Sequence, residues 1–135
     1  MTIGTHYTFG TRLARPLAEA RPLVEAALRA EGFGVLTEID VAATMRTKLG
    51  IEQDPYLILG ACNPPLAHRA LQVDPSVGAL LPCNVVLREE AGQTIVEALD
   101  PTAAMGISDA PGLVDVASEA RERLQRVIAS LEVQA

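Results

Sequence analysis

The chain has 135 residues, of which 49% are hydrophobic and 3% aromatic, and it carries a formal net charge of −6. The excess of acidic residues, 17 Asp and Glu against 11 Lys and Arg, argues against a nucleic-acid partner, because phosphate binding needs clustered basic side chains. The apolar runs are shorter than the roughly 20 residues that span a bilayer, and residues 1–15 lack the apolar core of a signal peptide. We therefore expect residues 1–135 to form a single cytoplasmic domain without a membrane partner, in which both cysteines are reduced.

The N-terminal segments are expected to form a strand and a helix. Residues 3–10 alternate as in a short strand. Residues 16–31 have apolar positions at helical spacing, and Gly32 is a natural left-handed stop after them. Pro22 lies inside this segment, where proline lacks the N–H group that a helix interior uses. Two alternatives follow: the helix kinks at Pro22, or its regular part starts there.

The middle of the chain is expected to contain two strands, each followed by a helix. The first strand covers residues 33–39, and Asp40 is a good N-cap for a short helix that ends at Leu49. The second strand covers residues 56–61 and is nearly all apolar, which is typical of a central or doubly buried strand. Asn63 would cap the next helix, whose inward stripe is apolar.

The C-terminal part predicts a hairpin and a long helix. Residues 82–89 and 94–99 flank a Glu-Ala-Gly-Gln turn, which is a strong hairpin signal. Apolar residues recur at helical spacing from Leu113 to Leu131, with Pro111 near the start of this last helix. The resulting order, β-α-β-α-β-α-β-β-α, predicts an α+β two-layer sandwich in which helices cover a mixed sheet mainly on one face.

The two cysteines occur in the same dipeptide. Cys62-Asn63 ends the run of residues 56–61, and Cys83-Asn84 stands at the start of the predicted hairpin. Each cysteine therefore lies at the edge of a predicted core strand, where a side chain is held rigidly and is still reachable from solvent.

Three segments around these dipeptides share a pattern with a known family. They read EGFGVLTEID at residues 31–40, YLILGACNP at residues 56–64 and LLPCNV at residues 80–85. Together, and in this order, they resemble the domain of unknown function 302 family over about residues 5–131. The resemblance implies a small two-layer α/β domain that forms a homodimer, and it implies no activity. Pro22 departs from the family pattern, which puts the local geometry of the first helix in question.

Cys62 is the first candidate for chemistry. It precedes the N-terminus of a predicted helix, where the helix dipole stabilises a thiolate and lowers its pKa. Such a thiolate could act as a nucleophile, a redox-sensitive group or a soft-metal ligand. The alternative is structural, because free cysteine is among the most buried residue types. This alternative is stronger for Cys83, which stands beside Pro82 at the start of a strand.

Cys62 and Cys83 would act together if their strands were neighbours. Their proximity would allow a reversible disulfide or a metal site with two thiolates. His68 is the candidate for a further metal ligand, and Met105 is a softer one. The alternatives are a solvent-facing helix position for His68 and a core-filling loop position for Met105.

Two functional hypotheses follow from these residues. The first is binding of a small ligand or a soft metal, or redox sensing, with Cys62, Asn63, Cys83 and Asn84 as the ligand-binding residues. The two asparagines would contribute amide donors and acceptors. The second is a structural or interaction module that acts as a homodimer and in which both cysteines are buried without function. Whether the protein is an enzyme stays open, because the chain has no recognised nucleotide or metalloprotease motif and a thiol enzyme would have only His68 as a base. No cofactor follows from the sequence.

Overall fold

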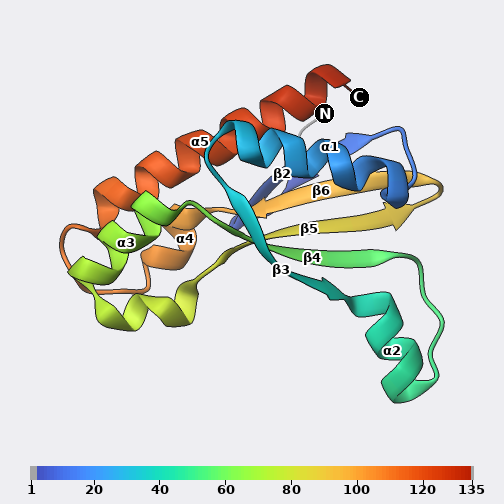
Figure 1. Ribbon diagram of the computed structural model, residues 1–135, viewed down its shortest axis with the longest axis horizontal. Helices are drawn as coiled ribbons and strands as arrows, with labels where there is room; N and C mark the ends of the chain where they lie inside the picture. The colour runs from blue at the N-terminus through green and yellow to red at the C-terminus, as the bar shows by residue number, and fades with distance from the viewer. Residues whose placement is uncertain (1–2, 135) are drawn as a thin grey trace.

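The computed structural model describes residues 3–134 and is built around one sheet (Figure 1). Six strands lie in the order β1-β2-β6-β5-β4-β3. The strands are β1 (Ile3–Gly4), β2 (Thr8–Leu13), β3 (Gly34–Asp40), β4 (Tyr56–Cys62), β5 (Cys83–Glu90) and β6 (Gln93–Leu99). Buried and more exposed side chains alternate along most of β5, which is the pattern of a sheet with one covered face.

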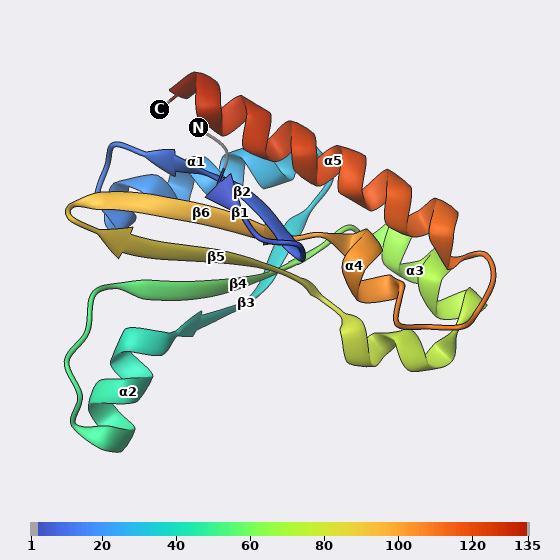
Figure 2. The same ribbon diagram turned by 180° about the vertical axis from the view of Figure 1, so that it is seen from behind.

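Helices cover one face of this sheet and one of its ends. They are α1 (Leu17–Ala30), α2 (Val41–Leu49), α3 (Pro64–Val73), the 3-10 helix η1 (Pro75–Leu80), α4 (Pro101–Met105) and α5 (Leu113–Gln134). Helices α1 and α5 lie together over the sheet, whereas α3 and α4 gather beside one end of it (Figures 1 and 2). The predicted two-layer α+β arrangement, with helices mainly on one face, is thereby confirmed.

The sheet is antiparallel throughout residues 3–134, where the sequence led us to expect a mixed sheet. The connections explain the difference. A parallel strand pair needs a crossover that returns along the sheet, but α2 projects away from the sheet and α3 stays beside its end (Figure 2). Strands β4 and β5 therefore each start at the end of the sheet where the preceding strand stopped.

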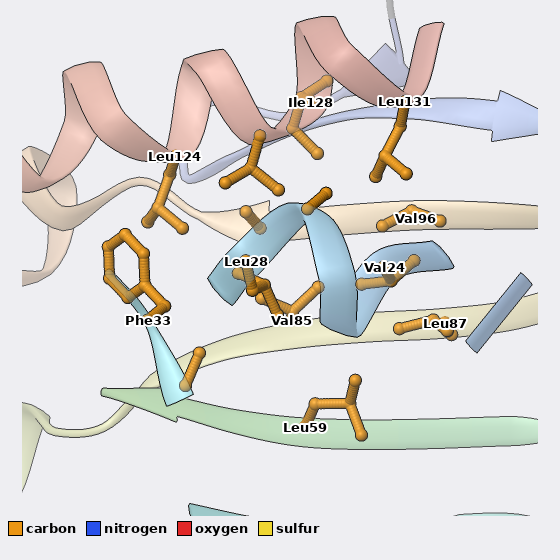
Figure 3. Close-up of a cluster of buried hydrophobic side chains, with 14 of the residues drawn as sticks. Val24, Leu28, Phe33, Leu59, Val85, Leu87, Val96, Leu124, Ile128 and Leu131 are labelled. Carbon is orange, nitrogen blue, oxygen red and sulfur yellow. The ribbon is translucent and has the colours of Figure 1, made fainter. Parts of the chain in front are cut away.

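The main core lies between the sheet and the two covering helices (Figure 3). Both α1 and α5 repeat apolar residues every three to four positions, so each presents a continuous apolar stripe to the sheet. The buried side chains include Val24, Leu28, Phe33, Leu59, Val85, Leu87, Val96, Leu124, Ile128 and Leu131. Complete burial of an aliphatic side chain contributes roughly 1.5–3 kcal/mol, so this cluster is a major source of stability.

A second, smaller cluster lies at the end of the sheet among α3, η1, α4 and the first half of α5. Its buried members are Leu66, Ala70, Val77, Met105, Leu113, Val116, Ala117 and Ala120. The sequence does not predict η1 or α4, because each is too short to show a helical period. Both are fixed by aspartate N-caps: Asp74 accepts from the Ser76 N–H at 3.0 Å, and Asp100 accepts from the Thr102 N–H at 2.9 Å.

The first strand and the first helix differ in detail from what the sequence led us to expect. The expected strand over residues 3–10 is two strands, β1 and β2, because the Thr5 hydroxyl accepts hydrogen bonds from the N–H groups of Tyr7 and Thr8 and turns the chain. Helix α1 begins at Leu17 and continues through Pro22, so the alternative in which its regular part starts at Pro22 is wrong. Pro22 lies on the exposed side of the helix.

Helix α2 projects from the body as an arm (Figures 1 and 2). The predicted helix is confirmed: the Asp40 side chain accepts from the Ala43 N–H at 2.9 Å, and Gly50 ends the helix in the left-handed region at φ 67°. None of the side chains of α2 is buried. The arm is therefore held by its caps and its connection to β3 and β4, and it adds nothing to either core cluster.

Candidate functional site

An apolar cavity of about 280 Å³ lies where the two core clusters meet, at the end of the sheet beside α3. Its walls come from the ends of three strands and from the helices around them. The lining residues are Phe33, Leu36, Ala61, Cys62, Asn63, Leu66, Ala67, Leu71, Gly78, Leu81, Pro82, Cys83, Met105, Val116 and Ala120. Among these residues, Asn63 is the one whose side chain carries nitrogen or oxygen, so the wall is almost entirely apolar.

The antiparallel pairing of β4 and β5 brings Cys62 and Cys83 to this cavity. Ala61 is the register partner of Cys83, so Cys62 lies one residue beyond the position opposite Cys83. Both cysteines are free and both line the cavity. Cys83 is only 7% exposed, whereas Cys62 is half-buried. The strands that carry the two cysteines are thus neighbours, as a joint role requires.

Burial raises the pKa of both thiols. For Cys83, burial and then the charge of Cys62 raise the pKa to about 11, and for Cys62 burial alone raises the pKa. This direction is opposite to the lowering that the sequence suggested for Cys62. The first two residues of α3, Pro64 and Pro65, lack the N–H groups that would stabilise a thiolate there. Both thiols are therefore protonated at neutral pH and present a weakly polar, polarizable surface.

Asn63 holds the turn between β4 and α3. Its Oδ1 accepts a hydrogen bond from the Leu66 N–H at 3.3 Å, which is the N-cap that the sequence predicted. Its Nδ2 donates to the carbonyl oxygen of Glu31 at 3.4 Å, which ties this turn to the end of α1. The side chain is 7% exposed. A buried amide is therefore fixed at the wall of the apolar cavity.

Asn84 and His68 lie outside the cavity. Asn84 follows Cys83 in β5, so the alternation of side chains along a strand places it on the other face of the sheet, where it is exposed. His68 is on the exposed side of α3. Within residues 3–134, no group of three or more His, Cys, Asp or Glu side chains could hold a metal ion. His68 thus lies apart from the cavity that the two cysteines line, and a metal site that includes all three stays a prediction.

The remaining wall residues carry no chemical signal in the sequence. Phe33, Val116 and Ala120 come from segments whose apolar pattern is explained by packing alone. Met105 is buried in the second cluster and lines the cavity, so its core-filling role is confirmed, but it ends α4 instead of lying in a loop. The cavity arises between elements, and no pattern within a single segment could have indicated it.

Comparisons with known proteins bear on the family and the fold. The profile of the family described as domain of unknown function DUF302 matches residues 9–131. The crystal structure of an uncharacterised conserved DUF302 protein from Bacillus stearothermophilus is similar, with a TM-score of 0.85 and 30% sequence identity over 93% of this chain and 98% of that one. No curated protein matches the sequence. Among the described residues, no helix has the length and apolar character needed to cross a membrane.

Proposed function

The chain belongs to the DUF302 family, domains of unknown function, and we propose that this member binds a small, mainly apolar ligand in the cavity beside Cys62 and Cys83. The observation that carries the proposal is the cavity itself, a space of about 280 Å³ with an almost entirely apolar wall that opens to solvent beside α3. Ligand sites are concave and mostly apolar, with a few polar groups that orient the ligand. This cavity combines an apolar wall with the single amide of Asn63.

The rim of the cavity supports the same conclusion. Leu36 from β3 is 65% exposed and Leu71 from α3 is 41% exposed, and both line the cavity. A ligand in the cavity would cover apolar surface at both positions, and removal of such surface from water contributes roughly 25 cal/mol per Å². Apolar rather than ionic contacts would therefore supply most of the binding free energy.

The two thiols fit this role better than redox or metal chemistry. Thiol–disulfide exchange starts from a thiolate, and burial raises the pKa of Cys62 and Cys83 instead of lowering it. In their protonated state both side chains behave as small hydrophobic groups. We assign them to the wall of the ligand cavity, where they also serve as natural reporters of its occupancy.

The proposal is tested by a titration with α-methylstyrene, a small apolar molecule, followed by the backbone amide signals of the protein in two-dimensional NMR. We expect saturable shifts at Cys62, Leu66 and Cys83. The substitution Ala67→Leu places extra side-chain volume at the wall and should weaken binding by about tenfold or more, since a steric mismatch of this size costs roughly 1–3 kcal/mol.

Gln72→Leu is the matched control. It introduces the same side chain on the same helix, α3, at an exposed position that does not line the cavity. Its binding constant should equal that of the unmodified protein. Shifts that map to another part of the molecule, or equal affinities for the two variants, would refute the proposed site.

A further inference from the structure

We infer that the ligand is a neutral carbonyl compound with an apolar body, and that the side-chain amide of Asn63 donates a hydrogen bond to its carbonyl oxygen. This inference rests on the proposed function, because it specifies which ligand the same cavity accepts. Three observations carry it: the unused hydrogen-bonding capacity of Asn63, the shared acceptor at Glu31 and the chemistry of the surrounding wall.

Asn63 uses only part of its hydrogen-bonding capacity. A side-chain amide offers two N–H donors and an oxygen that accepts two hydrogen bonds. Within residues 3–134 the side chain makes one donated bond, to the Glu31 carbonyl, and one accepted bond, from the Leu66 N–H. Buried polar groups are rarely left unpaired, because lost hydration is costly. A ligand atom that accepts the second N–H would satisfy a donor that the protein leaves free.

The existing bond to Glu31 is shared. The carbonyl oxygen of Glu31 also accepts from Nη1 of Arg123 at 3.1 Å, which is shorter than the 3.4 Å bond from Asn63. The turn at Gly32 packs closely against the amide, since a Cβ added there would lie 2.9 Å from Nδ2 of Asn63. Neighbouring groups therefore fix the position of the amide without using its second N–H.

The wall determines which ligand fits this donor. The other lining side chains with hydrogen-bonding atoms are the thiols of Cys62 and Cys83 and the thioether of Met105, which are weak partners. No Lys or Arg lines the cavity, so an anionic ligand would be buried without a counter-charge, which is strongly unfavourable. A neutral carbonyl oxygen needs one good donor and no charge, and Asn63 supplies that donor.

A matched pair of probes tests the inference. Acetophenone and α-methylstyrene have the same shape, and they differ by exchange of the carbonyl oxygen for a methylene group. Dissociation constants for both are measured with the full chain by two-dimensional NMR. We expect acetophenone to bind roughly three- to tenfold more tightly, which corresponds to one additional hydrogen bond.

Two substitutions remove the donor and keep the helix cap. Asp and Ser are N-cap residues as good as Asn, so Asn63→Asp and Asn63→Ser both retain an acceptor for the Leu66 N–H. Ionised Asp has no donor, and Ser replaces the amide by a hydroxyl on a side chain that is one atom shorter. In either variant the preference for acetophenone should disappear or reverse, while α-methylstyrene still binds. Unchanged NMR spectra away from α3 would verify that each variant is folded.

The outcomes separate this inference from the proposed function. Equal affinity of the unmodified protein for the two probes, with shifts at the cavity, would overturn the role of Asn63 and leave the apolar site intact. A preference for acetophenone that persists in both variants would overturn it as well. If neither probe binds at the cavity, the proposed function fails and this inference fails with it.

Discussion

Cys83 is the residue whose ionisation the fold opposes most clearly. Burial, together with the charge of Cys62, raises the pKa of Cys83 to about 11, whereas an unfolded thiol ionises near pH 8.5. The native state therefore keeps its proton in a range where the unfolded state has lost it. Stability should be complete below pH 8.5 and should decrease as the pH rises toward 11.

The expected loss of stability at alkaline pH leads to a first prediction. In urea unfolding measured from pH 7 to pH 11, Cys83→Ala should lose part of the alkaline decrease and should cost about 1 kcal/mol at pH 7 through lost packing. An unchanged alkaline slope in the Cys83→Ala variant would show that this thiol does not titrate as described.

The two thiols should also differ in their rates of alkylation. The half-buried Cys62 should be modified faster than the buried Cys83.

Glu97 affects stability at acid pH, in the sense opposite to the effect of Cys83 at alkaline pH. Burial by itself raises the pKa of Glu97, but hydrogen bonds from Arg88 and Thr8 and the charge of Arg88 outweigh it, so the net pKa is lowered. A lowered pKa contributes stability above the unfolded value of about 4.3, which is lost as the pH falls through the folded value. Glu97→Gln should therefore be less stable than the unmodified protein at pH 7 and should show a flatter acid branch. Parallel acid branches for the two proteins would exclude this contribution.

Gly10 is required by close packing of strands, and Gly34 is its matched control. A Cβ on Gly10 would collide with the carbonyl oxygen of Val96 and would lie 3.0 Å from the Cα of Glu97, whereas a Cβ on Gly34 has no atom within 4 Å. Gly10→Ala should lower the free energy of unfolding by more than about 2 kcal/mol. Gly34→Ala should leave it equal or raise it by about 0.4–1 kcal/mol through reduced freedom of the unfolded chain. Equal effects in chemical denaturation would contradict this reading.

At the residue scale the sequence indicated part of the site. The pairing of Cys62, Asn63 and Cys83 followed from their positions at strand ends, and the structure brings all three to one cavity. Side chains alternate between the two faces along β5, which separates Asn84 from Cys83. The position of Asn84 outside the cavity could therefore have been derived from the sequence. The direction of the Cys62 pKa could not, because it depends on burial by elements distant in the chain.

At the scale of elements, the arm is the part whose stability is most local. Helix α2 has no buried side chain and depends on the cap that Asp40 supplies. Asp40→Ala should cost the helix about 1 kcal/mol, and hydrogen exchange should accelerate over residues 41–49 without a change in the global unfolding midpoint. A lowered midpoint for the whole protein would show that the arm is coupled to the core.

Long periodic elements were predictable and short ones were not. The stripe from Leu113 to Leu131 correctly predicted α5, and the turn between β5 and β6 correctly predicted the hairpin. The helices η1 and α4 contain too few residues for a period, and their positions depend on packing in the second cluster. Local sequence also could not show that α3 stays beside the sheet, which is why the fully antiparallel pairing was missed.

At the scale of the whole molecule, the homodimer that the family resemblance implies stays a prediction. Sedimentation equilibrium over a range of concentrations would measure the oligomeric state directly, and a mass of one chain at all concentrations would contradict the homodimer.

The arm offers a position for substitution, Leu49, whose side chain is 64% exposed. Since the Leu49 side chain is mostly exposed, Leu49→Ser should change the free energy of unfolding of the single chain by no more than about 0.5 kcal/mol.

The layered architecture was accessible from sequence because binary patterning determines which face of each element is buried. The cavity was not, since it depends on how two clusters of apolar residues from β3, β4, β5, α3, α4 and α5 meet and leave space between them. Side-chain volumes and element positions together determine such a space, and neither is encoded in a local period. The functional site is thus a property of the assembled molecule.

The most direct test of the ligand cavity uses the two cysteines as reporters, since both line it. Alkylation of the native protein is followed by mass spectrometry, residue by residue, with increasing α-methylstyrene. The account predicts that labelling of both Cys62 and Cys83 slows, with one saturation constant equal to the dissociation constant from NMR. Labelling rates that do not change at saturating ligand would contradict binding at this cavity.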